Sequence, residues 1–485
     1  MLEEIKEANN VSYTENGALS LETTNSNCLD FFAKAGAMRN QNKELLLTLF
    51  NRSWAENKLD TLKILFFLRD IRGGLGEREL FRTIVKNLTP QQRKSIKKNY
   101  SLFPLMGRYD DLFSFFGTEC EESMLKFIKA QLESDIEALS KNKEVSLLAK
   151  WLPSINATNG ETIRRAKLLC TYLDMSNKEY RKLIASLRKK IGIIENNLRI
   201  RDYSFDYSKQ CSKAMMKYRN AFITNDKDRY MEYLNGVKKG EKSLHTETLL
   251  PYDIVAKCFS NRLSLEEIEA LDTTWKSLPN FVNDENAIAV VDGSGSMYFP
   301  VTPSPAAVAQ SLGIYFAEHA KGEFHNHFIT FSNTPRLIEI KGNDIVEKVH
   351  FCMDYNECAN TNIQATFDLI LNVAVKNHIP QSEMIEKIYI ISDMEFDMGC
   401  DENDQTNFEV AKEKFKKAGY KLPTIIFWNV CARGEQVPVK KDERGVTLVS
   451  GFSPILFRQV TGENVTPYSY MRKILDSERY EQVKV

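Results

Sequence analysis

The hydrophobic pattern changes near Leu278–Asn280, and this change divides the chain into two differently built parts. Before that point, apolar residues recur at helical spacing in segments separated by Gly, Pro, Asn or Asp. These segments include Leu59–Asp70, Glu79–Leu88, Glu121–Ser140 and Lys178–Ile191. No strand-like alternation of useful length interrupts them. We therefore predict an α-helical repeat domain over residues 1–280, of the HEAT-like solenoid kind, whose closure into a ring is left open.

After residue 284, short apolar runs alternate with helical stretches. The runs are Ala287–Val291, Phe328–Phe331, Ile388–Ile391 and Thr424–Trp428, and the helical stretches are Pro305–Ala320, Ile363–Asn377 and Phe408–Ala418. Strands of this kind between helices are typical of a parallel sheet covered on both faces. We predict a doubly wound α/β domain over residues 284–475, with a tail over residues 476–485. The segment Cys400–Asp404 is expected to be a solvated loop.

Charge is balanced overall but unevenly distributed. The chain has 65 basic and 65 acidic residues, so bulk charge predicts neither a nucleic-acid binder nor a membrane-surface protein. Residues 1–250 contain 42 basic and 32 acidic residues, and within them residues 141–250 contain 23 and 12. This asymmetry indicates two domains with different partners.

No targeting or membrane segment is visible in the sequence. Apolar runs such as Ile64–Leu68 are far shorter than the roughly 18 residues that cross a bilayer, and the acidic start lacks the apolar core of a signal peptide. The nine cysteines form no C-x-x-C pair, which predicts reduced, mostly buried thiols. We expect a cytoplasmic monomer that does not associate with membranes.

The segment from Asp292 to Ser296, Asp-Gly-Ser-Gly-Ser, directly follows the first predicted strand. Its spacing lets one carboxylate and two hydroxyls converge at the carboxyl end of that strand, where open α/β sheets bind ligands. Thr361 opens a later helix, and Asp393 follows another strand. Oxygen ligands of this kind favour Mg²⁺, with Mn²⁺ as the alternative.

These three segments together resemble the von Willebrand factor A domain with its metal-ion-dependent adhesion site. The resemblance implies that Asp292, Ser294, Ser296, Thr361 and Asp393 hold the metal directly or through water, leaving one position for a partner's acidic side chain. The alternative is a polar turn after a strand. The strained G-x-S-x-G elbow of hydrolases is missing, and no acid, base or nucleophile constellation emerges, so we do not expect an enzyme.

The basic surplus lies partly on one helix face. On Lys178–Ile191, the side chains of Leu183, Ile184, Leu187 and Ile191 share one arc, and the basic residues lie opposite. The candidate RNA contacts from this helix and the next basic stretch are Lys178, Arg181, Lys182, Arg188, Lys189, Lys213, Lys217 and Arg219. Such a stripe would concentrate a polyanion, although a solvated helix face explains the same pattern.

Residues Leu68–Arg82, with Arg-Asp, Gly-Gly and Gly-Glu-Arg in order, resemble a segment of the TROVE module of the Ro ribonucleoprotein and telomerase-associated proteins. Gly107–Leu112 resembles that family's Gly-Arg-Trp-Asp-Asp-Leu signature with Tyr109 in place of Trp, and Asn177–Leu183 resembles a later helix. The resemblance implies a ring of helical repeats that binds single-stranded RNA ends in its hole and small structured RNAs outside. The alternative for Leu68–Arg82 is an inter-helix loop with glycines at positive φ and Arg–Asp pairs.

The chain is also similar to an uncharacterised family of viral, plant, fungal and bacterial proteins with this layout, through Leu148–Ser154 and Ile426–Asn429. The first hypothesis is therefore a non-enzymatic RNA-binding scaffold resembling the Ro ribonucleoprotein, with a divalent-metal A domain. The alternative is a protein-interaction adaptor in which the metal site grips an acidic residue of a partner.

Overall fold

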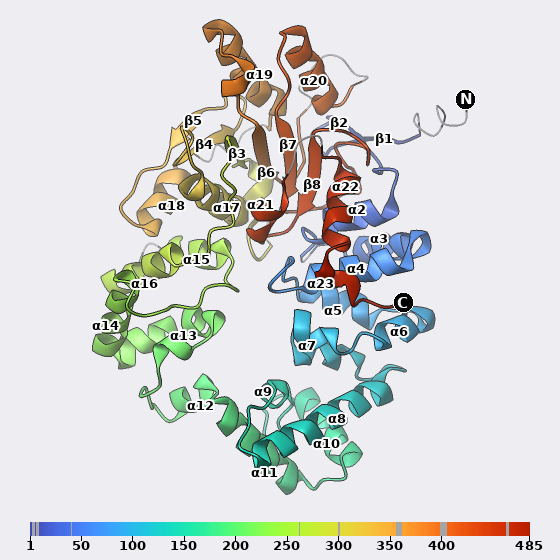
Figure 1. Ribbon diagram of the computed structural model, residues 1–485, viewed down its shortest axis with the longest axis vertical. Coiled ribbons are helices and arrows are strands. Elements are labelled where there is room, and N and C mark those ends of the chain that lie inside the picture. Colours follow the sequence, from blue (N-terminus) through green and yellow to red (C-terminus); the bar gives the residue numbers. More distant parts are fainter. Residues whose placement is uncertain are drawn as a thin grey trace.

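A computed structural model describes residues 1, 5, 9–39, 41–260, 262–298, 301–355, 361–397, 405–461 and 465–485. A helical region comes first and an α/β domain follows it (Figure 1). This order confirms the two kinds of structure that the hydrophobic pattern predicts. The segment Cys400–Asp404 lies outside the described residues.

The helical region is built of short helices joined by tight turns. The helices are α2 (Asn27–Ala35), α3 (Lys43–Glu56), α4 (Lys58–Arg69), α5 (Glu79–Lys86), α6 (Pro90–Lys97), α7 (Leu102–Met106), α8 (Glu121–Ser140), α9 (Leu148–Trp151), α10 (Gly160–Tyr172), α11 (Asn177–Ile191), α12 (Ile194–Arg199), α13 (Ser212–Asn225), α14 (Lys227–Lys238), α15 (Pro251–Cys258) and α16 (Leu265–Lys276). Two 3₁₀ helices, η1 (Tyr109–Phe115) and η2 (Tyr207–Lys209), complete it.

Helix α11 shows how local sequence sets these boundaries. The Ser176 hydroxyl accepts from the backbone of Glu179, whose side chain accepts in return from the Ser176 backbone. This reciprocal pair satisfies donors that the first helical turn leaves free. The helix ends at Gly192, whose φ of +70° suits a residue without a Cβ. The predicted helix, Lys178–Ile191, differs from the observed one by a single residue.

The α/β domain is built on a six-stranded sheet in the order β5-β4-β3-β6-β7-β8. Its strands are β3 (Ala287–Asp292), β4 (His327–Phe331), β5 (Leu337–Glu339), β6 (Lys387–Ser392), β7 (Thr424–Asn429) and β8 (Val446–Ser450). Its helices are α17 (Pro305–His319), α18 (Ile345–Met353), α19 (Ile363–Asn377), α20 (Asn407–Lys417), α21 (Ile455–Gln459), α22 (Pro467–Leu475) and α23 (Glu478–Glu481), with 3₁₀ helices η3 (Gly295–Tyr298) and η4 (Gln381–Glu383). The sheet is mixed rather than purely parallel, because the edge strand β5 runs antiparallel to β4.

Alternate residues of the buried strands face two different cores. Tyr389 and Ile391 of β6 belong to one core, which also contains α17 and continues into most of the helical region. Ile388 and Ile390 belong to the other core, together with residues of α19 and α20. Since successive side chains of a strand point to opposite faces, this division explains why β6 is apolar throughout.

A short antiparallel hairpin precedes α2, formed by β1 (Val11–Tyr13) and β2 (Leu19–Leu21). We expected no strands in the first 280 residues, so this is a correction. The hairpin is too short to bury its own core, and it lies on the α/β domain through bridges from Gly17 to Asp397 and from Leu21 to Val437. Such a small unit is stable only when it is packed against a larger one.

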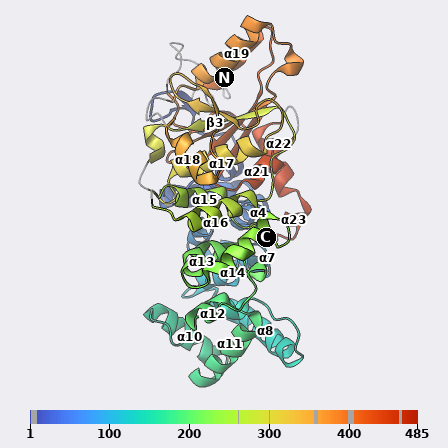
Figure 2. The same ribbon diagram turned by 90° about the vertical axis from the view of Figure 1, so that its left-hand side faces the viewer.

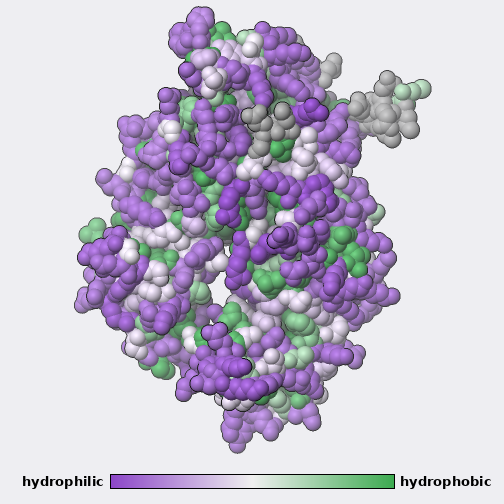
Figure 3. All heavy atoms as spheres, viewed as in Figure 1, coloured by the Kyte–Doolittle hydropathy of each residue, from purple (hydrophilic) through white to green (hydrophobic). Residues whose placement is uncertain are grey.

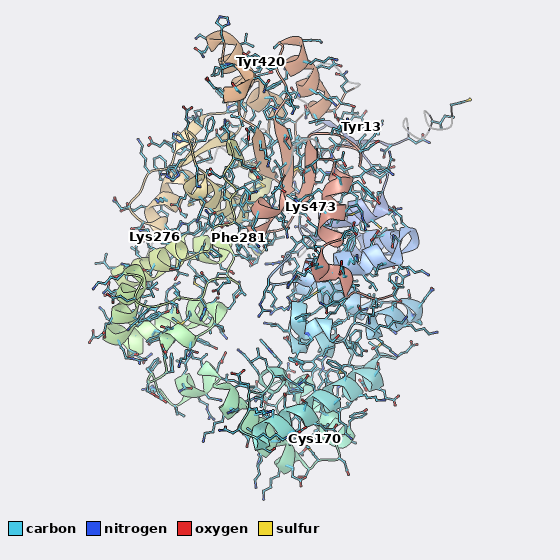
Figure 4. The ribbon with its side chains drawn as sticks, viewed as in Figure 1. Tyr13, Cys170, Lys276, Phe281, Tyr420 and Lys473 are labelled. Atoms are coloured by element: carbon cyan, nitrogen blue, oxygen red, sulfur yellow. The ribbon has the colours of Figure 1, made fainter. Side chains whose placement is uncertain are left out.

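The helical region leaves the α/β domain on one side and returns to it on the other. At its start, α2 packs on β8 and α22, and α4 packs on α22 and α23. At its end, α15 and α16 pack on α17 and α18. Figure 2 shows α15 and α16 between the α/β domain and α13 and α14, with α10, α11 and α12 at the far end. Figure 4 places Lys276 and Phe281 near this junction and Cys170 at the opposite end.

The C-terminal tail packs on the helical region. Arg479 and Tyr480 of α23 bond to Asp70 after α4, and Lys484 bonds through its backbone to Asn99. Residues 476–485, predicted only as a tail, are therefore a strap between the two parts of the molecule.

Among the described residues, no helix combines the length and apolarity needed to cross a bilayer. Seven described cysteines are free thiols, and six of these are buried, the exception being Cys211.

Candidate functional site

Two acidic residues lie at the carboxyl ends of adjacent parallel strands. Asp292 is the last residue of β3, and Asp393 directly follows β6, with Val291 paired to Ile391 in register. The strand order reverses between β3 and β6, since β4 lies on one side and β7 on the other. Open α/β sheets bind ligands at such a crevice.

The loop after β3 gathers oxygen atoms around Asp292. One carboxylate oxygen of Asp292 accepts from the backbone N–H of Ser294 at 2.9 Å, and the other accepts from the Ser392 hydroxyl at 2.5 Å. The hydroxyls of Ser294 and Ser296 are 3.0 Å apart. The Asp-x-Ser-x-Ser spacing therefore brings its alternate side chains together.

Glu395 connects the other two predicted ligands. The Thr361 hydroxyl donates to the Glu395 carbonyl oxygen at 2.8 Å, and the Glu395 N–H donates to Asp393 Oδ1 at 3.2 Å. Thr361 and Asp393 are thus held at the same end of β6. All five predicted ligand residues are placed at the carboxyl edge of the sheet by these contacts and by the strand register.

The site is acidic and buried. Asp292 is 1 % exposed and forms no ion pair with a described residue. Burial, and then the charge of Asp393, raise the pKa of the Asp292 carboxyl to about 7. Two carboxylates and three hydroxyls are a donor set that suits a hard divalent cation, so the residues present fit Mg²⁺. No group of three His, Cys, Asp or Glu side chains suited to a metal exists in the described part of the chain, and this set relies on hydroxyls instead.

An arginine contacts the same site. One guanidinium nitrogen of Arg433, Nη2, lies 2.8 Å from Asp393 Oδ2 and 3.2 Å from a carboxylate oxygen of Glu15. Sequence reasoning missed both residues. Glu15 lies in the hairpin turn, and no local signal connects it to a segment more than 400 positions later.

A second candidate site is a large central cavity. It has a volume of about 1110 Å³, above the roughly 300–1,000 Å³ of typical small-molecule pockets. Figure 3 shows an opening in the same central region of the molecule. Its charged lining residues are Arg39, Arg69, Arg78, Arg108, Lys150, Arg188, Lys213 and Lys217, against Glu79, Asp110 and Glu195. The wall is therefore predominantly cationic.

Carboxylates neutralise some of these cations but not all of them. Lys213, for example, is paired with Asp253. Lys150 and Lys217 form no ion pair with a described residue, and Lys150 lies over the Trp151 ring instead. Arg188 bonds to two backbone carbonyls and to a serine hydroxyl, which leave its charge unneutralised. These three side chains supply the wall's uncompensated positive charge.

The predicted RNA contacts fall into three places. Lys178, Arg181, Lys182 and Lys189 are exposed on α11 outside the residues that line the cavity. Arg188, Lys213 and Lys217 line the cavity. Arg219, predicted to lie on a basic face, is only 6 % exposed, and burial lowers the pKa of its guanidinium. It packs within the cluster of α13 and α14 and has little surface to offer a ligand.

Arg188 also differs from a freely exposed cation. Its guanidinium donates to the carbonyls of Ala149 and Leu152 and to the Ser154 hydroxyl, at 2.7–2.9 Å. These bonds hold α11 against the end of α9. The helical pattern placed Arg188 on the polar face correctly, but only the fold reveals that this face meets another segment.

Aromatic rings accompany the cations in the cavity wall. Trp151, Tyr218 and Tyr252 line the cavity, and the Arg108 guanidinium lies 4.1 Å from the centre of the Trp151 ring. Cations and aromatic rings together form the usual lining of channels that take single-stranded nucleic acid.

The Leu68–Arg82 segment forms a buried ionic network. Arg69 Nε donates to Asp111 at 2.8 Å, and Arg82 Nε donates to the other oxygen of Asp111 at 2.7 Å. These pairs join α4 and α5 to the 3₁₀ helix η1. The predicted Arg–Asp pairing therefore occurs, and Arg69 is also at the cavity wall.

The glycines of this segment serve two different purposes. Only Gly76 has a positive φ, of +69°. At Gly74 an added Cβ would lie 2.1 Å from the Phe67 carbonyl oxygen, so close backbone approach explains that glycine. The expectation that positive φ explains the Gly73-Gly74 pair is therefore corrected.

Comparisons with known proteins match both parts of the chain. Residues 286–481 match the family described as Domain of unknown function (DUF7788), and residues 14–99 and 162–288 match Domain of unknown function (DUF2828). The chain is 28% identical to the Uncharacterized protein L728 of Acanthamoeba polyphaga mimivirus over 510 residues, covering 96% of this chain and 87% of that protein. The similarity to a viral protein agrees with the predicted resemblance to an uncharacterised family that includes viral proteins. Neither family description names the TROVE module or the von Willebrand factor A domain.

Proposed function

We propose that this protein is a non-enzymatic RNA-binding scaffold that holds single-stranded RNA in its central cavity. The observation that carries the proposal is the cavity wall, which is lined by the positive charges of Lys150, Arg188 and Lys217 together with the Trp151 ring. Such a wall attracts phosphates and offers bases a surface for stacking. In an overall neutral chain, this local excess provides the attraction that bulk charge does not.

The proposal also includes the resemblances to the Ro ribonucleoprotein and to the von Willebrand factor A domain. We take the helical region as a Ro-like ring of HEAT-like repeats and the α/β domain as a von Willebrand factor A domain. The closed path of the helices and the arrangement of Asp292 and Asp393 at the switch point support this assignment. In this proposal Mg²⁺, or Mn²⁺, supplies an electrophilic point at the sheet edge that an acidic side chain can approach.

Salt-dependent RNA binding tests the cavity. Fluorescence anisotropy would follow a labelled oligouridylate bound by the unmodified protein and by a variant in which Lys150 and Lys217, the two lysines of the wall without an ion pair among the described residues, are replaced by Gln. Each lost phosphate contact reduces the slope of log affinity against log salt by about 0.7, so two contacts reduce it by about 1.4. The variant should also weaken binding of all sequences alike, since phosphate contacts carry little sequence information.

A matched control removes the same charge elsewhere. Replacing Lys178 and Lys182 by Gln removes two exposed cations from α11 outside the cavity lining. The cavity proposal expects this control to keep the affinity and slope of the unmodified protein. Equal losses of RNA affinity in both variants would mean that binding depends on overall charge and not on the cavity. A loss of affinity only in the control would mean that the RNA binds the outer surface of α11.

Metal binding is tested separately. Isothermal titration calorimetry with Mg²⁺ should show binding to the unmodified protein and at least about tenfold weaker binding to Asp292→Ala and Asp393→Ala, because each change removes an anionic ligand. Equal affinities in all three proteins would show that the ligand assignment is wrong.

A protein-interaction adaptor is the second candidate. The buried carboxylate and hydroxyl set at the sheet edge favours it, because this set exceeds what the fold alone requires. In this alternative, the bound metal grips an acidic residue of a partner. Purification from native cells with sequencing and mass spectrometry separates the two: enriched small RNA supports the scaffold, and a stoichiometric protein without RNA supports the adaptor.

A further inference from the structure

The geometry points to Arg433 as a built-in counter-ion that competes with the divalent cation for Asp393 and moves onto Glu15 when the cation binds. This inference rests on the proposed metal site and adds two residues to it. Arg433 belongs to the segment after β7, and Glu15 belongs to the hairpin turn, so neither is among the predicted ligands. Their role is to position charge around Asp393 rather than to ligate metal.

Arg433 contacts Asp393 directly. Arg433 Nη2 lies 2.8 Å from Asp393 Oδ2, and the two side chains are 14 % and 0 % exposed. A cation bound to Asp393 would bring a double positive charge close to this guanidinium. Water screens little at such burial, so the repulsion is strong. The cation and Arg433 therefore compete for the same carboxylate.

Glu15 offers Arg433 a second carboxylate. The same nitrogen lies 3.2 Å from Glu15 Oε2, whose side chain is 58 % exposed. Glu15 therefore already shares the guanidinium and can keep it after Asp393 has turned to the metal. A small shift of the shared guanidinium toward Glu15 is then sufficient to release Asp393 for the cation, and the buried charge of Arg433 need not leave the site.

Hydrogen bonds fix the hairpin turn that carries Glu15 at this place. The Glu15 N–H donates to Glu395 Oε2 at 2.7 Å, and the Asn16 side chain donates to the Glu395 carbonyl at 2.7 Å and to the Thr361 hydroxyl at 3.3 Å. Thr14 adds a hydroxyl bond to the Phe396 carbonyl at 2.6 Å. The turn thus contacts the metal site directly and holds the Glu15 carboxylate beside Arg433.

Calorimetry with Mg²⁺ alone on the full chain tests the inference. Arg433→Gln should raise the affinity for Mg²⁺ by about tenfold or more, because the competing charge is gone. Arg433→Lys, which keeps the charge, should stay close to the unmodified protein. The matched control is Arg52→Gln, which removes an equal charge from an exposed ion pair with Glu435. Glu435 is two positions from Arg433 in the sequence. This control should leave the Mg²⁺ affinity unchanged within about twofold.

Glu15 is tested in both backgrounds. Glu15→Gln should weaken Mg²⁺ binding by about threefold in the unmodified protein, because Arg433 then has a poorer alternative partner. In the Arg433→Gln background, the same change should have no effect. An equal loss in both backgrounds would mean that Glu15 acts on the metal without Arg433, and this would overturn the proposed coupling.

The remaining outcomes separate this inference from the metal site itself. If the unmodified protein binds Mg²⁺ and Arg433→Gln binds it equally well, the counter-ion role is wrong and the site stands. If neither protein binds Mg²⁺, the site and the inference both fail. Thermal unfolding monitored by circular dichroism shows whether each variant is folded. A rise in the Mg²⁺ affinity of folded Arg433→Gln supports the inference, and a fall overturns it.

Discussion

Asp70 offers a direct test of what the Leu68–Arg82 segment does. Its carboxylate is fully buried and accepts from the Arg479 guanidinium, with one bond of 2.7 Å, and from the Tyr480 hydroxyl at 3.0 Å. It also accepts from the backbone N–H groups of Arg72 and Gly73 at 3.0 and 3.1 Å. We predict that Asp70→Ala destabilises the protein mainly by stranding these donors.

The magnitude follows from the groups left behind. Removing one partner of a buried ion pair costs about 3–5 kcal/mol. Arg479 is 37 % exposed, so water can solvate part of its charge after the change, and this favours the lower end of that range. The Tyr480 hydroxyl keeps only a contact of 3.4 Å with the Gly73 carbonyl, so its lost bond adds to the cost. We expect a loss of about 3–4 kcal/mol for Asp70→Ala, and a smaller loss for Asp70→Asn, which keeps the shape.

Urea unfolding followed by circular dichroism measures this loss. Asp284→Asn is the control, because it breaks an exposed pair with Lys321 that contributes about 0–1 kcal/mol. Hydrogen exchange adds a local measurement: residues 476–485 should lose protection in Asp70→Ala, since the network holds the C-terminal strap. A loss below about 1 kcal/mol with unchanged exchange in the strap would refute the structural role and leave Asp70 free for another one.

Three further perturbations test other parts of the structure. Burial lowers the pKa of the Lys34 ammonium from its ordinary value near 10.5 to about 8. The free energy of unfolding of the unmodified protein relative to Lys34→Met should therefore rise by about 3 kcal/mol between pH 8 and pH 10.5, as measured by urea unfolding at each pH. A difference in unfolding free energy that does not change with pH would contradict the burial argument. Gly74→Ala would place a Cβ 2.1 Å from the Phe67 carbonyl oxygen and should lower the free energy of unfolding by about 1–3 kcal/mol in the same assay. The control Gly160→Ala has open space around the added Cβ and should leave the free energy of unfolding unchanged. Equal effects of the two changes would contradict the close-approach argument. Arg188→Ala should lower the free energy of unfolding by about 2–4 kcal/mol, because three acceptors lose their donor. An unchanged free energy of unfolding would mean that Arg188 behaves as an exposed basic side chain.

The sequence determined the elements and the two classes of structure, because hydrophobic period and capping are local properties. The predicted segment Glu121–Ser140 is helix α8, and Ile363–Asn377 is helix α19, with the same ends. Strands β3 and β6 were each predicted to within one residue at either end. Besides the hairpin strands β1 and β2, the missed strands were β5, which is only three residues long, and β8, whose short apolar run was not distinguished from its surroundings.

Part of the proposed metal site was also readable from the sequence. The Asp-Gly-Ser-Gly-Ser spacing and the positions of Thr361 and Asp393 depend on strand ends, which a local pattern marks. The structure adds the strand order, which places β3 beside β6 and so brings Asp292 and Asp393 to one crevice. Strand order is a tertiary property, because it depends on how distant strands pair.

Only the tertiary structure decided which charges are available to a ligand. Arg181 and Arg188 lie on the same helix and are both basic, but Arg181 is exposed while Arg188 is bonded to the neighbouring segment. Arg219 was assigned to a polar face and is buried. Likewise, Glu15 and Arg433 meet beside Asp393 although they are far apart in the chain. A helical pattern specifies which face of a helix is apolar, but the partner of the opposite face depends on long-range packing, and that information is not local in the sequence.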